Sequence, residues 1–305
     1  MKGIVTKSTG SWYDLLGEDR QMYQGRLRGK FKTHELKVTN PIAVGDNVEF
    51  ELVGDGTVSI TSILPRQNYI LRKSPHKTAH AHLLAANIDQ AVLVVTIARP
   101  RTSTGFIDRF LISAEAFRIP VILVFNKTDL LNDDDLELRD ALTLLYQPVC
   151  EEIVHCSALT GENTDQLQRL LHGKKTLLSG HSGVGKSTVI NRIAPNLNLR
   201  TGEISDFSEK GTHTTTFAQM FELANDTFII DTPGIKELGL IDMEKEEIAH
   251  YFPEMRALLG NCRFHNCLHV NEPGCAVKSS VNDGTIHESR YYNYLGMLEE
   301  KDTHR

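Results

Sequence analysis

Short apolar segments separated by turn residues make up the first part of the chain. Residues 47–53 and 57–64 are each the length of one strand, and Gly45 and Gly54 mark turns beside them. No strong helical pattern interrupts this region. The sequence therefore predicts a small all-β domain, a barrel or a sandwich, over residues 1–66.

A different pattern follows a polar, basic stretch at residues 67–85, which we interpret as a linker. Residues 91–96 and 121–125 are continuous apolar runs, typical of strands buried on both faces, and a helical pattern separates them. Further strands and helices alternate after these runs, with strands at 153–158, 175–179 and 227–231 and helices near 134–146, 163–172 and 186–194. This alternation predicts an α/β domain with a parallel sheet over residues 86–236.

The bulk composition limits the class of protein. A chain of 305 residues is long enough for two or three domains, and 40% hydrophobic with 24% charged residues is typical of a soluble globular protein. No apolar run approaches the roughly 20 residues that cross a bilayer, and residues 1–10 lack the pattern of a secretory signal. We expect a cytoplasmic monomer without a membrane partner, and the net charge of −6 argues against indiscriminate nucleic-acid binding.

One local stretch of the predicted β-domain is nevertheless basic. Six cations lie between Arg20 and Lys37 against one acid, with Tyr23 and Phe31 among them. Such a mixture suits RNA, because cations follow the phosphates and aromatic rings stack on bases. A solvated strand edge protected by lysines is the alternative, and this stretch alone does not decide between them.

A phosphate-binding loop is the clearest motif of the α/β domain. Residues 180–187 read Gly-His-Ser-Gly-Val-Gly-Lys-Ser, between a predicted strand and a predicted helix. In this pattern backbone amides surround the phosphates, Lys186 reaches the terminal phosphates, and the Ser187 hydroxyl binds magnesium. The predicted phosphate-binding residues are Ser179, Gly180, His181, Ser182, Gly183, Val184, Gly185, Lys186, Ser187 and Thr188.

Two further motifs at strand ends indicate guanine. Residues 126–129, Asn126, Lys127, Thr128 and Asp129, end a buried strand, and the Asp129 carboxylate can accept from the N1 hydrogen and the 2-amino group of guanine, which adenine lacks. Helix capping is the alternative for this tetrapeptide. Ser157 and Ala158 follow another strand, where the Ala158 amide can face guanine O6. Together these motifs predict a GTP site.

Two segments resemble the switches of a GTPase. Asp231 to Gly234 follows a strand, so that Asp231 can hold the magnesium shell and the Gly234 amide can sense the γ-phosphate. Residues 211–216, Gly-Thr-His-Thr-Thr-Thr, lie in the position of a first switch, and we expect Thr215, with Thr214 as the second choice, to complete the magnesium ligands. Ordinary loop chemistry is the alternative for both segments.

Residues 237–305 are mostly helical in pattern and contain three of the five cysteines of the chain. Cys262, Cys267 and Cys275 lie close to His265 and His269, and three thiolates with one imidazole form a closed tetrahedral zinc set without a place for substrate. We therefore expect one structural Zn²⁺, with unligated buried cysteines as the alternative. Cys150 and Cys156 lack partner spacing and are expected to be core residues.

The order of the nucleotide motifs carries a resemblance to a known family. The guanine motifs at 126 and 157 precede the phosphate loop at 180 and the Asp231 segment, whereas Ras-like GTPases begin with the phosphate loop. With a β-domain before it and a Cys/His cluster after it, the chain resembles the ribosome small-subunit-dependent GTPase A family over nearly its whole length.

The resemblance implies an N-terminal OB-fold, a circularly permuted Ras-like GTPase domain and a C-terminal, mostly helical zinc-binding domain. It also implies Mg²⁺ with GTP, and His269 rather than His265 as the fourth zinc ligand. As a member, the protein would bind the 30S ribosomal subunit and its rRNA in late maturation of that subunit. It would hydrolyse GTP to GDP and phosphate with stimulation by the 30S particle.

The residue that orients the catalytic water is not evident. Many Ras-like GTPases carry Gln directly after the Gly234 position, but Ile235 stands here and cannot orient water. His213 of the first switch is our candidate, and a solvated loop residue or an RNA contact is the alternative. Two other functions remain open: an RNA-binding assembly factor that keeps GTP as a structural ligand, and a P-loop kinase or ATPase, which Asp129 opposes.

Overall fold

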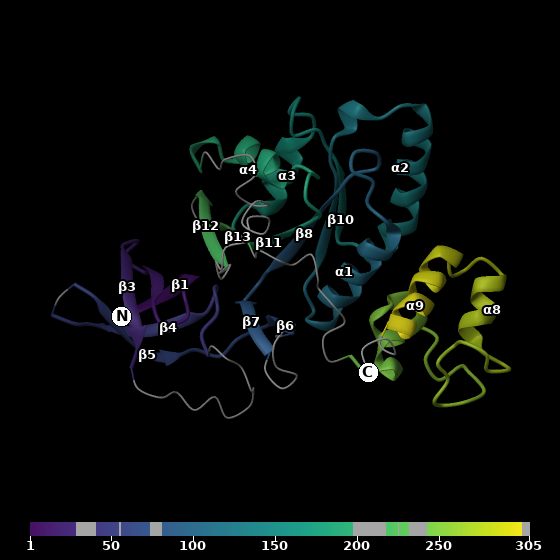
Figure 1. The fold of residues 1–305 in the computed structure, drawn as a ribbon, viewed down its shortest axis with the longest axis horizontal. Coiled ribbons are helices and arrows are strands. Elements are labelled where there is room, and N and C mark those ends of the chain that lie inside the picture. Colours follow the sequence, from purple (N-terminus) through teal and green to yellow (C-terminus); the bar gives the residue numbers. More distant parts are fainter. Residues whose placement is uncertain are drawn as a thin grey trace.

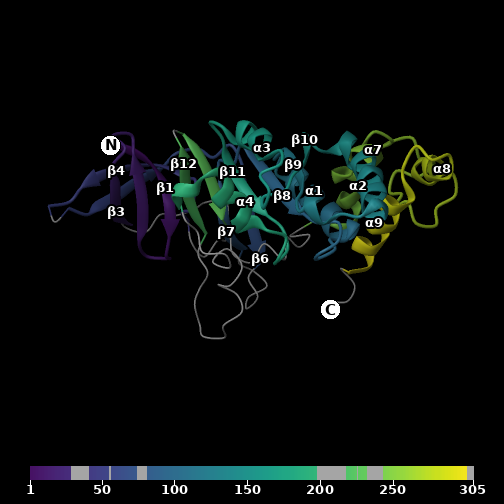
Figure 2. The same cartoon turned by 90° about the horizontal axis from the view of Figure 1, so that it is seen from above.

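The computed structural model describes residues 1–28, 41–54, 56–73, 81–197, 218–224, 226–231 and 243–300. These residues form three parts in a row: an N-terminal barrel, a central α/β layer and a C-terminal helical module (Figure 1). Figure 2 shows the same row from above, with the barrel and the helical module at opposite ends. The central layer therefore contacts both neighbours.

The N-terminal part is a closed five-stranded barrel. Its strands are β1 (Lys2–Ser8), β2 (Tyr13–Gly17), β3 (Met22–Leu27), β4 (Asn47–Leu52) and β5 (Val58–Ile63). Their order is β1-β2-β3-β5-β4, and β4 pairs with β1 to close the barrel. This is the topology of an OB-fold, and it confirms the barrel rather than the sandwich.

Alternation of side chains fills this barrel. The buried positions of β2 and β4 follow the period of two expected of strands with one face inside, whereas the alternation in β1 is interrupted between Val5 and Lys7. The barrel core consists of Val5, Tyr13, Leu15, Ile42, Val48, Phe50, Val58 and Ile60.

A short hairpin connects the barrel to the central layer. The strands β6 (Tyr69–Lys73) and β7 (Ala81–Ala86) pair antiparallel within the segment that the sequence predicted as a linker. The polar residues between these strands hide their short apolar runs from a pattern search. The segment is therefore a structured connection over its described residues.

The central sheet has the order β10-β9-β8-β11-β13-β12. Its strands are β8 (Gln90–Val95), β9 (Val121–Phe125), β10 (Glu152–His155), β11 (Lys175–Ser179), β12 (Gln219–Ala224) and β13 (Thr227–Asp231). All neighbouring pairs are parallel except β12 with β13. The predicted parallel α/β sheet is confirmed, and β12 is its antiparallel strand, which pairs on its other side with β1 of the barrel.

Helices cover both faces of this sheet. They are α1 (Thr104–Ala116), α2 (Asp133–Tyr146), α3 (Thr164–Leu171) and α4 (Lys186–Ile193), with the 3₁₀ turns η1 (Thr128–Leu130), η2 (Gln147–Val149) and η3 (Pro195–Leu197). Apolar residues of α1 and α2 share one core with the sheet, and those of α3 and α4 share the other. Local signals begin these helices: Ser103 caps α1, and Asn132 with Asp135 forms a capping box for α2.

The C-terminal module is built from short helices, as predicted. They are α6 (Lys245–Ile248), η5 (Ala249–Tyr251), α7 (Pro253–Arg256), α8 (Ala276–Asn282) and α9 (Glu288–Glu300). Its apolar core includes Ile112 of α1, so the module packs directly on the central layer. No helix among the described residues is long and apolar enough to span a bilayer.

Candidate functional site

The phosphate loop lies between the end of β11 and the start of α4. Gly185 adopts a φ of +97°, and a Cβ there would lie 2.5 Å from Asn126 Nδ2, so only glycine fits. Lys186 Nζ donates to the carbonyl oxygens of Gly180, at 2.7 Å, and His181, at 2.9 Å. The loop thus curves around the ammonium group that is predicted to bind phosphate.

Asn126 joins the motifs that are separate in the sequence. Its Nδ2 donates to Val184 O of the phosphate loop at 2.8 Å, and its Oδ1 accepts from the Ala158 amide at 3.0 Å. The side chain is 3% exposed. The Ala158 amide, which was expected to face guanine O6, is bound to Asn126 in this structure.

Lys127 and Asp129 lie at the rim of the same site. Lys127 has a left-handed backbone, with a φ of +67°, and its Nζ donates to Arg99 O at 2.7 Å and Gly183 O at 2.6 Å. Ser157 Oγ donates to Asp129 Oδ1 at 2.5 Å. The Asp129 residue is otherwise exposed. Thr128 Oγ1 donates to Glu162 at 2.7 Å, which ties this motif to the loop after β10.

Two of the candidate magnesium ligands are described, one at the end of a strand and one in the helix after the phosphate loop. Asp231 ends β13 beside Leu178 of β11, and Ser187 is buried in the first turn of α4. Burial raises the pKa of Asp231 to about 6, while the nearby Lys186 ammonium acts in the opposite direction. A bound divalent cation would stabilise the carboxylate form further.

Three of the predicted site residues, His213, Thr215 and Gly234, lie outside the described residues. The remaining predicted phosphate-binding residues are in place around the loop. Ser179 is buried at the end of β11, Ser182 and Gly183 are exposed, and Thr188 follows Ser187 in α4. Hydroxyls and amides are therefore available on the open side of the loop.

The segment before α1 and the first turn of α1 contact this site, which the sequence did not reveal. Arg99 O accepts from Lys127, and the ring of Phe106 stacks on His181 of the phosphate loop with 3.7 Å between ring centres. An aromatic residue in an amphipathic helix looks like an ordinary core residue in the sequence. No local signal distinguishes Phe106 from Phe110, which is buried in the core.

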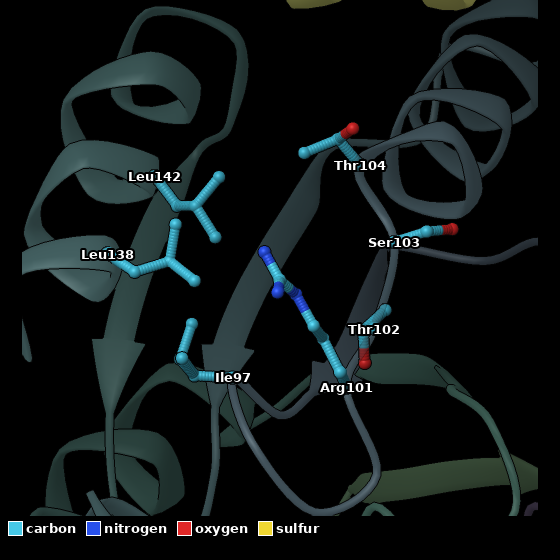
Figure 3. A pocket seen from close by; sticks show the side chains of 7 residues that line it. All are labelled: Ile97, Arg101, Thr102, Ser103, Thr104, Leu138 and Leu142. Atoms are coloured by element: carbon cyan, nitrogen blue, oxygen red, sulfur yellow. The ribbon is translucent and has the colours of Figure 1, made fainter. Parts of the chain in front are cut away.

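A cavity of about 230 Å³ lies beside this segment, between the start of α1 and α2. In Figure 3 the Arg101 side chain extends toward Leu138 and Leu142 from the opposite wall. The lining is Ile97, Arg101, Thr102, Ser103, Thr104, Leu138 and Leu142. None of the predicted nucleotide-binding residues lines it, so this cavity is separate from the nucleotide site.

The basic stretch of the barrel is only partly described, up to Arg28. Arg20 pairs with Glu222 and Asp226, Arg28 pairs with Glu51, and Arg26 stacks 3.9 Å above the ring of Trp12. Each of these cations therefore has a partner within the chain. Phe31 and the lysines up to Lys37 lie outside the described residues.

The Cys/His cluster brings four ligand atoms together in the C-terminal module. One ligand atom each from Cys262, Cys267, His269 and Cys275 lies within 4.8 Å of every other. His269 Nδ1 lies 3.6 Å from the Cys262 sulfur and 3.4 Å from the Cys275 sulfur. Ligands of a tetrahedral zinc lie about 3.5–3.8 Å apart, so this donor set fits the metal. His265 is exposed and outside this group.

Backbone amides and buried hydroxyls hold the cluster in shape. The Ala276 amide donates to the Cys262 sulfur at 3.3 Å, and the Lys278 amide donates to the Cys275 sulfur at 3.4 Å. Tyr291 donates to His269 O at 2.6 Å, which fixes the ligand-bearing backbone. Such outer bonds stabilise thiolates and orient ligands in metal sites.

Comparisons with known proteins give the same picture. A family model described as RsgA GTPase matches residues 63–241, and one described as RsgA N-terminal domain matches residues 2–60. The small ribosomal subunit biogenesis GTPase RsgA of Cytophaga hutchinsonii is 54% identical over 307 residues that cover 100% of both chains. The protein of that name from Bacteroides fragilis ATCC 25285 is 51% identical over 302 residues, covering 99% of this chain and 97% of its own.

Two solved structures are similar over the whole chain. YjeQ from Thermotoga maritima matches with a TM-score of 0.80 and 38% identity, covering 100% of this chain and 99% of its own. YloQ, a circularly permuted GTPase, matches with a TM-score of 0.76 and 28% identity, covering 100% of this chain and 96% of its own. The predicted permuted GTPase fold is confirmed.

Proposed function

This chain belongs to the RsgA GTPase family, and from that membership we propose that it acts on the small ribosomal subunit in its late maturation. It is a GTP-hydrolysing enzyme, and in the proposed function the 30S particle stimulates conversion of GTP and water to GDP and phosphate. The observation that supports the nucleotide site most directly is Asn126, which hydrogen-bonds both the phosphate loop and the Ala158 amide.

Within this proposal each motif has one task. Lys186 neutralises the terminal phosphates, and Asp129 accepts from the guanine edge. Ser187, Asp231 and Thr215 bind Mg²⁺, which supplies charge neutralisation on the phosphates when bound. The Gly234 amide senses the γ-phosphate, and His213 orients the attacking water once the particle has ordered the first switch.

The flanking parts complete the proposal. We assign residues 1–66 to an OB-fold that contacts rRNA, 67–85 to a linker, 86–236 to the GTPase domain and 237–305 to a domain with one structural Zn²⁺. The Zn²⁺ ligands are Cys262, Cys267, His269 and Cys275, supported by their mutual distances. The protein is a cytoplasmic monomer in this proposal.

GTP turnover by the free protein, with 30S subunits and with 70S ribosomes tests the function. We expect a higher kcat with 30S subunits, and equal turnover in all three conditions would instead favour a GTP-dependent RNA-binding factor. In the same assay, full stimulation of His213→Ala would remove His213 from the mechanism.

Nucleotide choice gives an independent test of the base site. Asp129→Asn should shift preference from guanosine to xanthosine nucleotides, because the amide can donate where the carboxylate accepted. Effective competition by ATP against the unmodified protein would contradict the guanine assignment.

A further inference from the structure

The helix α1 contacts the nucleotide site at its first turn. The Phe106 ring stacks on His181 of the phosphate loop, with 3.7 Å between ring centres and 30° between the planes. Just before the helix, Arg99 O accepts from Lys127, whose Nζ also donates to Gly183 O. The start of α1 therefore contacts the phosphate loop, and the segment before it contacts the guanine motif.

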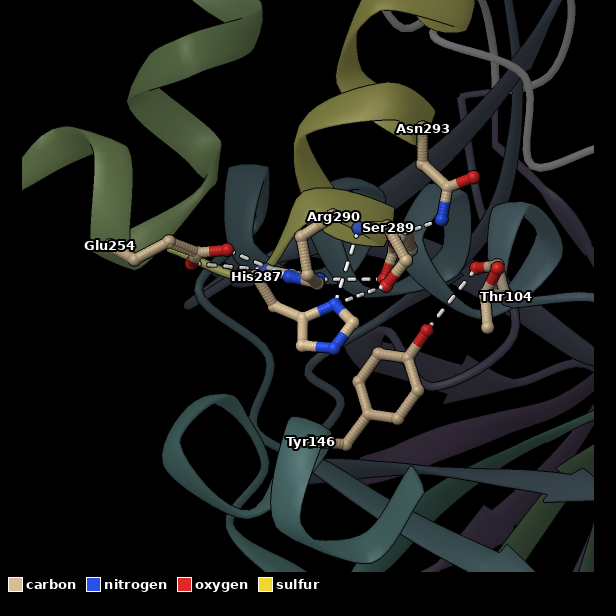
Figure 4. A network of polar contacts seen from close by, with 8 residues as sticks. Thr104, Tyr146, Glu254, His287, Ser289, Arg290 and Asn293 are labelled. Carbon is tan, nitrogen blue, oxygen red and sulfur yellow. Dashed lines mark hydrogen bonds and ion pairs between the residues drawn. The ribbon is translucent and has the colours of Figure 1, made fainter. Parts of the chain in front are cut away.

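The same turn of α1 contacts the C-terminal module through buried charges. Asp108 is fully buried and accepts from Arg290 Nη1 at 2.7 Å and from Asn293 Nδ2 at 2.5 Å, both on α9. Glu254 of α7 holds the other side of the Arg290 guanidinium, at 2.7 and 3.0 Å. Figure 4 shows this network between the helices, with Tyr146 donating to Thr104 O beside it.

The Arg290 guanidinium lies between two carboxylates, and this arrangement restricts its movement. Burial alone would lower the pKa of Arg290, but the carboxylates of Asp108 and Glu254 outweigh it and raise the pKa, so the guanidinium stays charged. Its carbon also lies 4.8 Å from the ring centre of Phe252. A buried ion with good hydrogen bonds on two sides has few alternative positions, because leaving them exposes an unpaired charge to the apolar core.

The geometry of an α-helix places the two contacts on opposite faces. Residues two apart are rotated by about 200° and shifted by about 3 Å along the axis. Phe106 therefore faces the phosphate loop while Asp108 faces α9, and a single turn of α1 is held between them. A displacement of α9 must move this turn, and the Phe106 ring moves with it.

We propose that Phe106 is a positioning residue of the nucleotide site, through which the C-terminal module sets the shape of the phosphate loop by way of Asp108 and Asn293. The inference rests on the proposed assignment of residues 180–187 to GTP binding. A displacement of the C-terminal module, for example when it docks to a large particle, is transmitted to the phosphate loop through one turn of α1. The two ends of this path are distinct sites joined by packed side chains and hydrogen bonds, which are the contacts that carry coupling between sites.

A double-mutant cycle on GDP affinity tests the proposal. Asn293→Ala removes one hydrogen bond to Asp108, and Phe106→Ala removes the stack on His181; the probe is a fluorescent GDP analogue with Mg²⁺. We expect Asn293→Ala to weaken GDP binding on the order of fivefold in the unmodified background, a typical coupling. In the Phe106→Ala background the same change should have no effect, because the path is already cut.

A matched control distinguishes coupling from general loosening of the module. Arg256→Ala removes the Arg256–Glu115 pair, which joins the same module to the far end of α1, where the two side chains are 48% and 37% exposed. Its GDP affinity should equal that of the unmodified protein. Equal weakening by Arg256→Ala and Asn293→Ala would overturn the proposal, as would additive effects in the cycle.

Two further measurements keep the outcome clear. Circular dichroism and metal content check that each variant is folded, and Asn293→Leu, which keeps the side-chain volume and the Asp108–Arg290 pair but removes the donor, replaces Asn293→Ala if that variant does not fold. Absence of GDP binding in the unmodified protein would refute the proposed nucleotide site itself. Normal binding with additive effects would refute only the role of α1.

Discussion

The central layer is joined to its two neighbours by different chemistry. On the barrel side there is backbone pairing: β1 pairs with β12 at Lys7 and Gln219, and the Ala86 amide donates to Val44 O, while apolar side chains such as Ile4 and Leu16 pack beside it. On the other side the contacts are side chains, with Arg290 at the centre of the buried network described above. Backbone pairing is therefore the distinguishing feature of the barrel joint, and a buried side-chain network is the distinguishing feature of the joint to the C-terminal module.

The two joints attach the barrel and the C-terminal module to different parts of the central layer. β12 follows the proposed first switch in the chain, and β13 ends at Asp231 of the proposed second switch, so the backbone joint is attached to the hairpin between these two segments. The side-chain joint is attached to α1, beside the phosphate loop. The barrel is therefore positioned by the switch hairpin, and the C-terminal module is positioned by the helix next to the phosphates.

Loss of the proposed Zn²⁺ should have the largest effect, centred on the C-terminal module. Cys275→Ser or strong chelation should unfold residues around the cluster, since structural zinc supplies on the order of 10 kcal/mol of folding free energy. The check is zinc content by elemental analysis with limited proteolysis of the module. His265→Ala, outside the cluster, is the control and should keep about one zinc per chain; loss of zinc in that variant would contradict the ligand assignment.

Breaking the buried pair should come next. Arg290→Met leaves Asp108 buried without its cation and should cost about 3–5 kcal/mol in the free energy of unfolding. Chemical denaturation followed by fluorescence measures this loss. Arg256→Ala, an exposed pair at the same joint, should cost less than about 1 kcal/mol, and equal losses would mean that the joint is not held by its buried residues.

The backbone joint has its own sensitive position, at Gly45. Its φ is +89°, and a Cβ would lie 2.1 Å from Ala86 O, so Gly45→Ala should cost about 2–3 kcal/mol through strain and displacement of the strand. Thermal unfolding is the measurement. Gly10→Ala has nearly the same φ, +88°, with nothing within 4 Å, and it isolates the conformational part of the cost. Equal losses at both positions would show that the close approach to Ala86 contributes nothing.

Removing the exposed pairs of the barrel joint should have the smallest effect. Arg20→Ala removes the contacts to Glu222 and Asp226, whose side chains are 35% and 73% exposed, and should cost about 0.2–1 kcal/mol. The loss should shrink in high salt, measured as Tm at two ionic strengths. Arg28→Ala, which acts within the barrel, serves as the control; a salt-independent loss of several kcal/mol at Arg20 would place a side-chain contact at the centre of this joint as well.

Local patterns account for what the sequence could predict. The continuous apolar runs of β8 and β9 and the glycine-rich loop before α4 each carry their signal within a few residues. The order of the motifs then predicted the permuted fold. The close spacing of Cys262, Cys267 and Cys275 likewise predicted the Cys/His cluster that the structure brings together.

Contacts between distant residues could not be predicted in this way. Arg290 lies in a charged terminal helix and looks like a solvated side chain, yet its partner Asp108 is 182 residues earlier and both are buried. Phe106 carries the pattern of a core residue although it stacks on the phosphate loop. Pairing of β1 with β12 follows from neither segment alone, since any exposed strand edge could accept either.

The pairing of β1 with β12 also sets the order in which the protein can be assembled during its synthesis. Arg20 and Glu222, which meet at this joint, are 202 residues apart in the chain. At about 5–20 residues per second, roughly 10–40 s pass between their emergence from a translating ribosome. The barrel can close through its own pairing of β1 with β4 during that interval. The end of β1 around Lys7 then lacks its partner until β12 is made, so this attachment of the barrel is a late event in the biogenesis of the protein.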